Sequence, residues 1–182
     1  MTPMQATDRR LGWATPANIV TLVRMALLPV FLVTVLQAEW ALALAVLVTI
    51  GASDIVDGQL ARKLDQVTAL GSRLDPIADR LTVVIVVGSY VVAHFLPWWI
   101  WVALVLTDLA LLVLLGRQQP PPVDWVGKLR TALLLVGLPL LLAGVLWRVV
   151  AFQEAAYWAV LLGAVGHVVA AIRYGVRIRA AR

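Results

Sequence analysis

The sequence predicts an all-α integral membrane protein with six transmembrane helices, and three observations support this fold class. Hydrophobic residues make up 62% of the 182 residues, whereas charged residues make up only 14%. A soluble core of this size could not bury so much apolar surface, so lipid must solvate much of it. Six apolar runs are separated by short polar or proline-containing segments, which is the pattern of helices that cross a membrane repeatedly.

The expected elements follow in order along the chain. Residues 1–17 form a polar segment with Trp13, and they suit a short interfacial helix before the first span. The rest of the chain, 18–182, is expected to be a single six-helix transmembrane domain. Its spans are expected at about 18–36, 40–53, 74–92, 98–115, 127–147 and 155–174. Pro97 and the Pro120–Pro122 run interrupt helices at two of the connections. Trp98, Trp99 and Trp101 are expected in an interfacial belt.

The basic residues predict the orientation of the spans. All 15 Lys and Arg residues except Arg148 fall at one face of the six-span layout. The positive-inside rule then places both termini on the cytoplasmic side of a bacterial-type inner membrane. These residues are scattered at helix ends and form no patch with interleaved aromatic residues, so the net charge of +5 does not indicate a nucleic-acid partner. The absence of cysteine excludes disulfides and thiolate metal sites.

Four of the ten acidic residues lie in one stretch between the second and third apolar runs: Asp54, Asp57, Asp75 and Asp79. On helices, each pair shares a face one turn apart. Carboxylates so close together repel one another unless cations lie between them, and oxygen-only ligands indicate Mg²⁺ or Mn²⁺. Two such cations would support displacement at phosphorus. The stretch would lie at the cytoplasmic membrane surface, where a lipid donor and a polar acceptor can both reach it.

Residues 54–79 resemble the signature of the CDP-alcohol phosphatidyltransferase family at all eight of its fixed positions, and the six-span layout is also similar. The resemblance implies transfer of a phosphatidyl group from CDP-diacylglycerol to an alcohol, with release of CMP and no covalent enzyme intermediate. It implies that Asp54, Asp57 and Asp75 are metal ligands and that Asp79 is both a ligand and the catalytic base. It also implies a homodimer, in contact with membrane lipids, and a CDP pocket lined by Asn18, Thr21, Gly58, Ala61, Arg62 and Gly71.

The acceptor is predicted from residues on both sides of this signature. Leu74–Arg80 resembles the form found in phosphatidylglycerophosphate synthases and eukaryotic-type cardiolipin synthases. The run Gly127–Thr131 resembles the glycerophosphate branch, and glycerol-3-phosphate is therefore the predicted acceptor, by a narrow margin. Thr107–Asp108 departs from the Arg-Glu pair usual in that branch and favours the alternative, a cardiolipin synthase that uses phosphatidylglycerol. The candidate acceptor-binding residues are Arg24, Arg117, Lys128 and Arg130.

Two other functions use similar residues. Intramembrane prenyl transfer also needs acidic, Mg²⁺-dependent sites, but the Gly-x-x-Ala-Arg element has no role in it. An ion transporter could carry paired intramembrane acids. The sequence leaves the roles of Asp108 and His167 open. Small residues on the sixth span, including Gly163 and Gly166, predict close helix packing.

Overall fold

The computed structural model describes the backbone of residues 16–63, 71–115 and 125–180, and side chains within 19–53, 77–113 and 125–176. This part of the chain is helical and contains no strand, as the composition predicts. Its helices are α1 (Pro16–Leu36), α2 (Trp40–Lys63), α3 (Gly71–Val92), α4 (Trp98–Leu115), α5 (Trp125–Leu146) and α6 (Val150–Ala180). The expected interfacial helix of residues 1–17 lies outside the described residues, except that its last two positions belong to α1.

Apolar length identifies the chain as an integral membrane protein. Three stretches are long and apolar enough to cross a membrane: Ile19–Leu36, Trp125–Leu146 and Val150–Val176. The apolar parts of α2 and α4 are shorter, at Trp40–Ser53 and Trp98–Val113. Large apolar side chains such as Val113, Trp125 and Val150 remain exposed on the outer faces of these helices. Such surfaces are stable in lipid, where a helix satisfies its own backbone hydrogen bonds.

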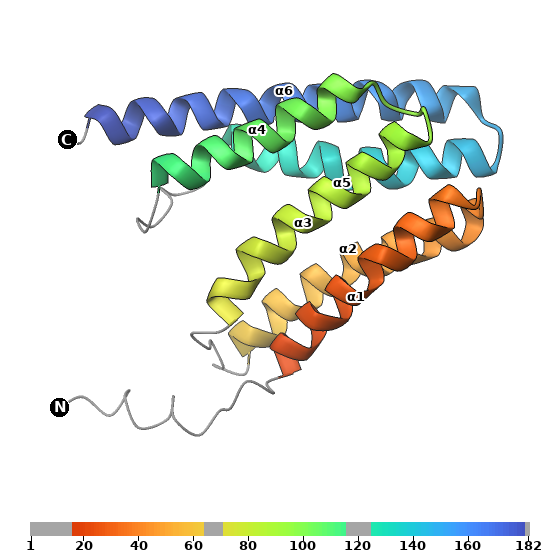
Figure 1. Ribbon diagram of the computed structural model, residues 1–182, viewed down its shortest axis with the longest axis horizontal. Coiled ribbons are helices and arrows are strands. Elements are labelled where there is room, and N and C mark those ends of the chain that lie inside the picture. The colour runs from red at the N-terminus through yellow and green to blue at the C-terminus, as the bar shows by residue number, and fades with distance from the viewer. Residues whose placement is uncertain (1–15, 64–70, 116–124, 181–182) are drawn as a thin grey trace.

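The same turn ends α1, α3 and α5, and it explains why the connections to the next helices are so short. Ala38, His94 and Arg148 each adopt a left-handed conformation, with φ values of 58°, 61° and 56°. The next amide in each turn donates to a carbonyl five residues earlier: Glu39 to Thr34, Phe95 to Tyr90 and Val149 to Gly144. These are Schellman motifs, which satisfy the last carbonyls of a helix. The three turns lie at the same end of the molecule (Figure 1).

The sixth helix begins at Val150 rather than near residue 155, so the expected start was wrong. The Schellman turn at Arg148 leads directly into the helix. The Gln153 side chain lies inside the first turns of α6 and donates from Nε2 to the carbonyl of Gly144 at 2.9 Å. A polar residue at this position therefore fastens α6 to the end of α5.

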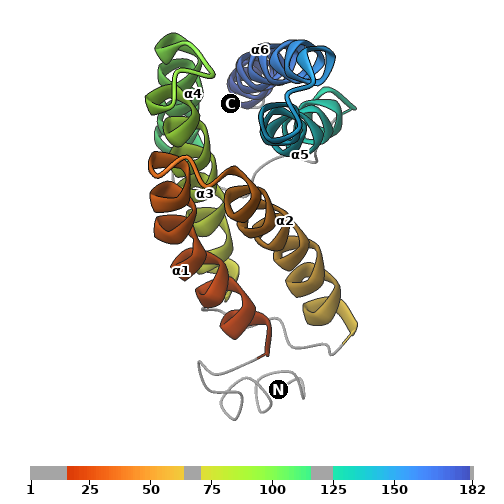
Figure 2. The same ribbon diagram turned by 90° about the vertical axis from the view of Figure 1, so that its right-hand side faces the viewer.

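The helices form two groups that meet near the three turns. Helices α1, α2 and α3 run together, while α5 and α6 lie side by side with α4 against α6 (Figures 1 and 2). Helix α2 contacts α5, and α3 contacts α4, so these two pairs of helices connect the groups. At the opposite end the first group diverges from the second (Figure 1). The signature residues belong to that end.

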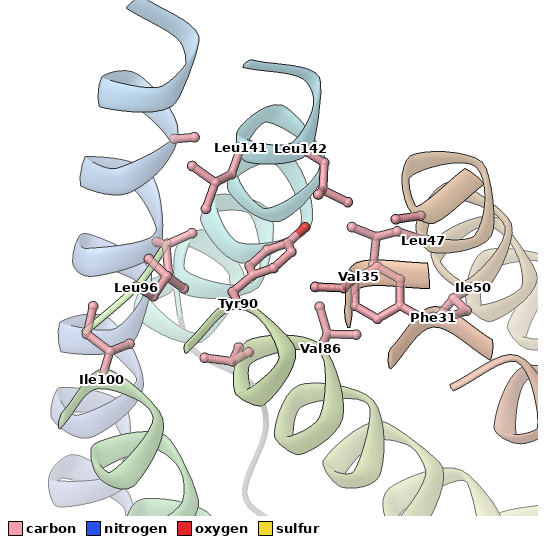
Figure 3. Packing of buried hydrophobic residues seen from close by; sticks show 14 of the residues in the cluster. Phe31, Val35, Leu47, Ile50, Val86, Tyr90, Leu96, Ile100, Leu141 and Leu142 are labelled. Carbon is pink, nitrogen blue, oxygen red and sulfur yellow. The ribbon is translucent and has the colours of Figure 1, made fainter. Parts of the chain in front are cut away.

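The buried core joins the two groups around Tyr90. Its side chain is fully buried between Phe31 and Val35 of α1 and Leu141 and Leu142 of α5 (Figure 3). The hydroxyl donates to the carbonyl of Leu138 at 2.8 Å, which satisfies its polar group inside the core. This bond links α3 to α5 and fixes the position along the two helices at which the groups meet.

The expected tryptophan belt is only partly present. Trp98 and Trp99 are exposed, as the interfacial reading predicts. Trp101 instead packs against α3, where its indole Nε1 donates to the carbonyl of Val84 at 2.8 Å. A Cβ atom on Gly88 would lie 3.0 Å from this nitrogen, so the glycine makes room for the ring.

Candidate functional site

An ion pair between α1 and α3 includes the last acidic residue of the signature. Arg24 Nη1 is 3.0 Å from Asp79 Oδ1 and donates a hydrogen bond to it. The Arg24 side chain is only 3% exposed, whereas that of Asp79 is 59% exposed. A guanidinium buried among apolar helices needs a partner, since an unpaired buried charge is strongly destabilising. The buried cation therefore fixes the position of an accessible carboxylate.

The first helix supplies this cation from one face. Thr21 and Arg24 are both buried, and they are one turn apart on α1. Arg24 is also one of the candidate acceptor-binding residues, and the structure places it beside Asp79. Asn18 precedes Thr21 by three positions on the same helix, and its side chain lies outside the described residues.

The other signature positions are defined by backbone alone. Asp54, Asp57, Gly58, Ala61 and Arg62 belong to the last turns of α2. Gly71 is the first residue of α3, with Asp75 one turn before Asp79. These helices have the backbone that puts each acidic pair on one face. The side chains of Asp54, Asp57 and Asp75 lie outside the described part, so their convergence stays a prediction.

The donor set at these positions is compatible with hard divalent cations. All four residues supply carboxylate oxygens, which Mg²⁺ and Mn²⁺ prefer. Asp79 is exposed enough for its carboxylate to bind a second group while Arg24 holds one oxygen. Among the side chains that the structure describes, no cluster of three His, Asp or Glu residues forms a separate metal site. The expected site therefore depends on the signature acids.

A second polar group joins three other helices. Arg130 of α5 forms a hydrogen bond from Nη1 to Nδ1 of His167, on α6. Nε2 of the same imidazole lies 3.0 Å from Asp108 Oδ1, on α4. This second contact lies at hydrogen-bond distance, but the nitrogen has no aligned hydrogen-bond partner among the described residues. Arg130, His167 and Asp108, called here the polar triad, therefore connect α5, α6 and α4.

Arg80 relates the polar triad to the signature through its charge. This residue directly follows Asp79 on α3, and both Arg80 and Arg130 act electrostatically on the Asp108 carboxylate. Lys128 is exposed near the start of α5, and Arg117 lies outside the described residues. Of the candidate acceptor residues, the structure thus places Arg130 in the triad and Arg24 beside Asp79.

Sequence analysis left Asp108 and His167 without a role, although two signals pointed to them. Both are ionisable residues inside apolar helices, where such groups need partners. The small residues of α6 are the second signal: a Cβ atom on Gly166 would lie 3.2 Å from the Cβ of Arg130. A Cβ atom on Gly163 would lie 2.9 Å from Cγ of Leu134. The predicted close packing of α6 is therefore confirmed, and it occurs where Arg130 meets His167.

Comparison with known proteins gives a consistent result. The family model described as CDP-alcohol phosphatidyltransferase matches residues 14–174. The chain is 37% identical to "Cardiolipin synthase (CMP-forming)" of Streptomyces coelicolor over 147 residues, which are 75% of this chain and 67% of the relative. A Mycobacterium tuberculosis protein, named as a candidate cardiolipin synthase, is 38% identical over 152 residues, covering 79% of this chain and 70% of the relative.

A relative with another acceptor in its name is also similar. "CDP-diacylglycerol--glycerol-3-phosphate 3-phosphatidyltransferase" of Escherichia coli is 33% identical over 143 residues. The aligned region covers 72% of this chain and 76% of the relative. Both branches that the residues 74–80 resemble are thus represented among the similar proteins.

Proposed function

The chain belongs to the CDP-alcohol phosphatidyltransferase family, and on this premise we propose the reaction and the residues that carry it out. The protein transfers a phosphatidyl group from CDP-diacylglycerol to the hydroxyl group of a phosphate-bearing glycerol acceptor, in phospholipid biosynthesis. CMP is the other product. The observation that carries this proposal is the Arg24–Asp79 pair, because it presents an accessible carboxylate at the final acid of a complete family signature.

Asp79 is the general base of the proposed reaction. Its carboxylate takes the proton of the acceptor hydroxyl, whose oxygen attacks the lipid-linked phosphorus of CDP-diacylglycerol. The bond from this phosphorus to the bridging oxygen breaks, and CMP leaves with the bonding electrons. Arg24 orients the carboxylate before the acceptor arrives, since its guanidinium donates a hydrogen bond of 3.0 Å to one carboxylate oxygen.

The remaining signature residues bind the donor. Two divalent cations, Mg²⁺ or Mn²⁺, would be held by the carboxylates of Asp54, Asp57, Asp75 and Asp79. When bound, they would offset the negative charge that the phosphates carry during transfer. The CDP group would contact a larger set of residues from α1, α2 and α3: Asn18, Thr21, Gly58, Ala61, Arg62 and Gly71. Glycines at two of these positions allow a nucleotide to approach the backbone.

Phosphatidylglycerol is the acceptor that we favour. The two cardiolipin-synthase relatives are 37% and 38% identical to the chain, and the glycerol-3-phosphate enzyme is 33% identical. Asp108 supports the same choice, because its negative charge offsets part of the positive charge of Arg130. A phosphodiester carries less charge than a phosphomonoester, so it needs fewer cations. This reverses the narrow preference for glycerol-3-phosphate that the sequence motifs gave.

Glycerol-3-phosphate remains the second candidate on a specific observation. The run Gly127–Thr131 places Lys128 and Arg130 one turn or less apart at the start of α5, and Lys128 is exposed. Two cations there suit a doubly charged phosphate. Arg117, which precedes this run in the sequence, is the third candidate cation for this acceptor.

The proposed orientation puts the reaction at the cytoplasmic surface of a bacterial-type inner membrane. All six helices would cross the membrane in residues 18–182, with both termini in the cytoplasm and residues 1–17 at the interface. Basic residues support this orientation: Arg148 lies in the turn between α5 and α6, at the end opposite the signature. As in the family that the chain resembles, we propose a homodimer.

Purified protein in lipid, supplied with CDP-diacylglycerol labelled in its acyl chains, tests the proposal. Phosphatidylglycerol, glycerol-3-phosphate and inositol phosphate are offered in parallel. Labelled cardiolipin with equimolar CMP is the expected outcome, and labelled phosphatidylglycerophosphate would identify the second candidate. Cation flux without CMP release would indicate a transporter, and inhibition by prenyl diphosphates rather than CDP-diacylglycerol analogues would indicate prenyl transfer. Either of these last results would overturn the proposal.

A further inference from the structure

We infer that Asp108 and His167 are positioning residues that hold Arg130 in place for the phosphate of the acceptor. This inference rests on the proposed function, because it concerns the acceptor side of the same reaction. It assigns a role to two intramembrane residues outside the signature. The phosphate is the chemistry that both candidate acceptors share, so the inference applies to either one.

The direction of the hydrogen bond between Arg130 and His167 follows from the donors. Arginine has only N–H donors, so Nδ1 of His167 must accept the bond from Arg130. A neutral imidazole that accepts at Nδ1 carries its hydrogen on Nε2, the atom 3.0 Å from the Asp108 carboxylate. Asp108 thus favours the tautomer that Arg130 needs, in the way that an outer carboxylate fixes a ligating histidine.

Arg130 has donor capacity that the described part of the protein does not use. Its Nε atom is buried and has no hydrogen-bond partner among the described residues. Leaving such a donor unpaired is costly, and a phosphate oxygen is a suitable partner for a guanidinium. One side of the guanidinium is thus held by His167, and the other side has a donor for a ligand.

Charge supports an anionic ligand at this place. Arg80 and Arg130 both act on Asp108, and these three groups sum to one positive charge when His167 is neutral. The excess positive charge lies among helices of low polarity, where it attracts an anion more strongly than it would in water. Because Arg80 follows Asp79, this charge is next to the proposed base along α3.

The packing of α5 against α6 fixes the base of the Arg130 side chain. Gly166 leaves room for it, since a Cβ atom at this position would be 3.2 Å from the Arg130 Cβ atom. Gly163, one turn earlier, lies close to the Arg130 carbonyl oxygen and Leu134. Close packing against α6 restricts the backbone of Arg130, and His167 restricts its guanidinium. Arg130 therefore loses less conformational entropy when it binds a ligand.

Steady-state kinetics of two variants tests the inference. Asp108→Asn removes the charge that fixes the tautomer, and we expect the KM for the acceptor to rise about tenfold, while the KM for CDP-diacylglycerol changes less than about twofold. His167→Asn retains an oxygen that can accept from Arg130, so its acceptor KM should rise less than that of His167→Leu. If Asp108→Asn does not fold, the two His167 variants decide the question.

Tyr90→Phe is the matched control, because it also removes a buried contact between helices, at 2.8 Å from Leu138, but without a charge. It should lower the melting temperature and leave the acceptor KM unchanged. If the triad variants behave like this control, or change both KM values equally, the triad is only a structural link and the inference is wrong. If the wild-type protein releases no CMP with any acceptor, the proposed function itself fails.

Discussion

The guanidinium of Arg24 is held 3.0 Å from the carboxylate of Asp79, and this pair joins the buried face of α1 to the accessible end of α3. The two partners differ sharply in exposure, at 3% and 59%. A buried cation that is covalently part of a packed helix cannot move away when a ligand binds. The pair therefore provides a fixed reference point for the acid that we propose as the base.

Substitution of Arg24 should impair the reaction more than the fold. In Arg24→Met an apolar side chain of similar length replaces the buried cation, and the Asp79 carboxylate that remains is exposed, so no buried charge is left without a partner. The Asp79 carboxylate would lose its orienting partner, and we expect kcat to fall about 10- to 100-fold with smaller changes in either KM. Arg24→Lys retains the charge but lacks the planar donors, so its kcat should lie between that of Arg24→Met and that of the wild type. Unchanged kcat in both variants would contradict the assigned role.

Close packing at Gly166 should matter for the acceptor. In Gly166→Ala the added methyl group would meet the Arg130 Cβ atom at 3.2 Å and displace the arginine. We expect the acceptor KM to rise about 3- to 10-fold. Gly51→Ala is the matched control, because its Cβ atom would meet only Leu135 Cδ1 at 3.6 Å, an ordinary contact. Equal acceptor KM values in the two variants would show that this packing does not position Arg130.

Gly144 should be important for stability rather than for catalysis. An alanine there would bring its Cβ atom to 2.8 Å from Gln153 Cγ and 2.9 Å from the Gln153 backbone nitrogen. Relief requires α6 to move away from α5, because one of these neighbours is backbone. We expect Gly144→Ala to lose about 1–3 kcal/mol of unfolding free energy. Thermal unfolding in detergent measures this loss, and a melting temperature equal to that of Gly51→Ala would contradict it.

The helices could largely be predicted from the sequence, because each apolar run ends at a proline, a turn or a cluster of polar residues. The start of α6 could not, since Gln153 is polar and its bond to the Gly144 carbonyl is a tertiary contact. The contact between Arg24 and Asp79 could not be predicted for the same reason. Helical spacing indicates that Thr21 and Arg24 share a face, but not that this face meets Asp79, which is 55 residues away from Arg24 in the sequence.

The contacts of the polar triad were even harder to predict from the sequence. The sequence leaves the roles of His167 and Asp108 open, because each is a single ionisable residue within its own apolar helix. Their relationship depends on α4, α5 and α6 meeting at one level, which the glycines of α6 permit. A pattern along one helix does not specify which neighbouring helix it meets.

Removal of divalent cations should abolish the proposed activity. Dialysis against a chelator should stop CMP release, and added Mg²⁺ or Mn²⁺ should restore it, because the carboxylate donors of the signature suit these ions. Zn²⁺, which prefers nitrogen and sulfur ligands, should restore little. Full activity after chelation would contradict the assignment of the four acids as metal ligands.

The role of Asp79 is tested by product formation in the Asp79→Asn variant. Purified wild-type protein in lipid, given CDP-diacylglycerol and phosphatidylglycerol, should form CMP and cardiolipin in equal amounts. The variant is nearly identical in shape but cannot accept the proton, so its rate should fall at least about 100-fold while it still binds CDP-diacylglycerol. An Asp79→Asn variant that turns over at the wild-type rate would contradict the assignment of this carboxylate as the base.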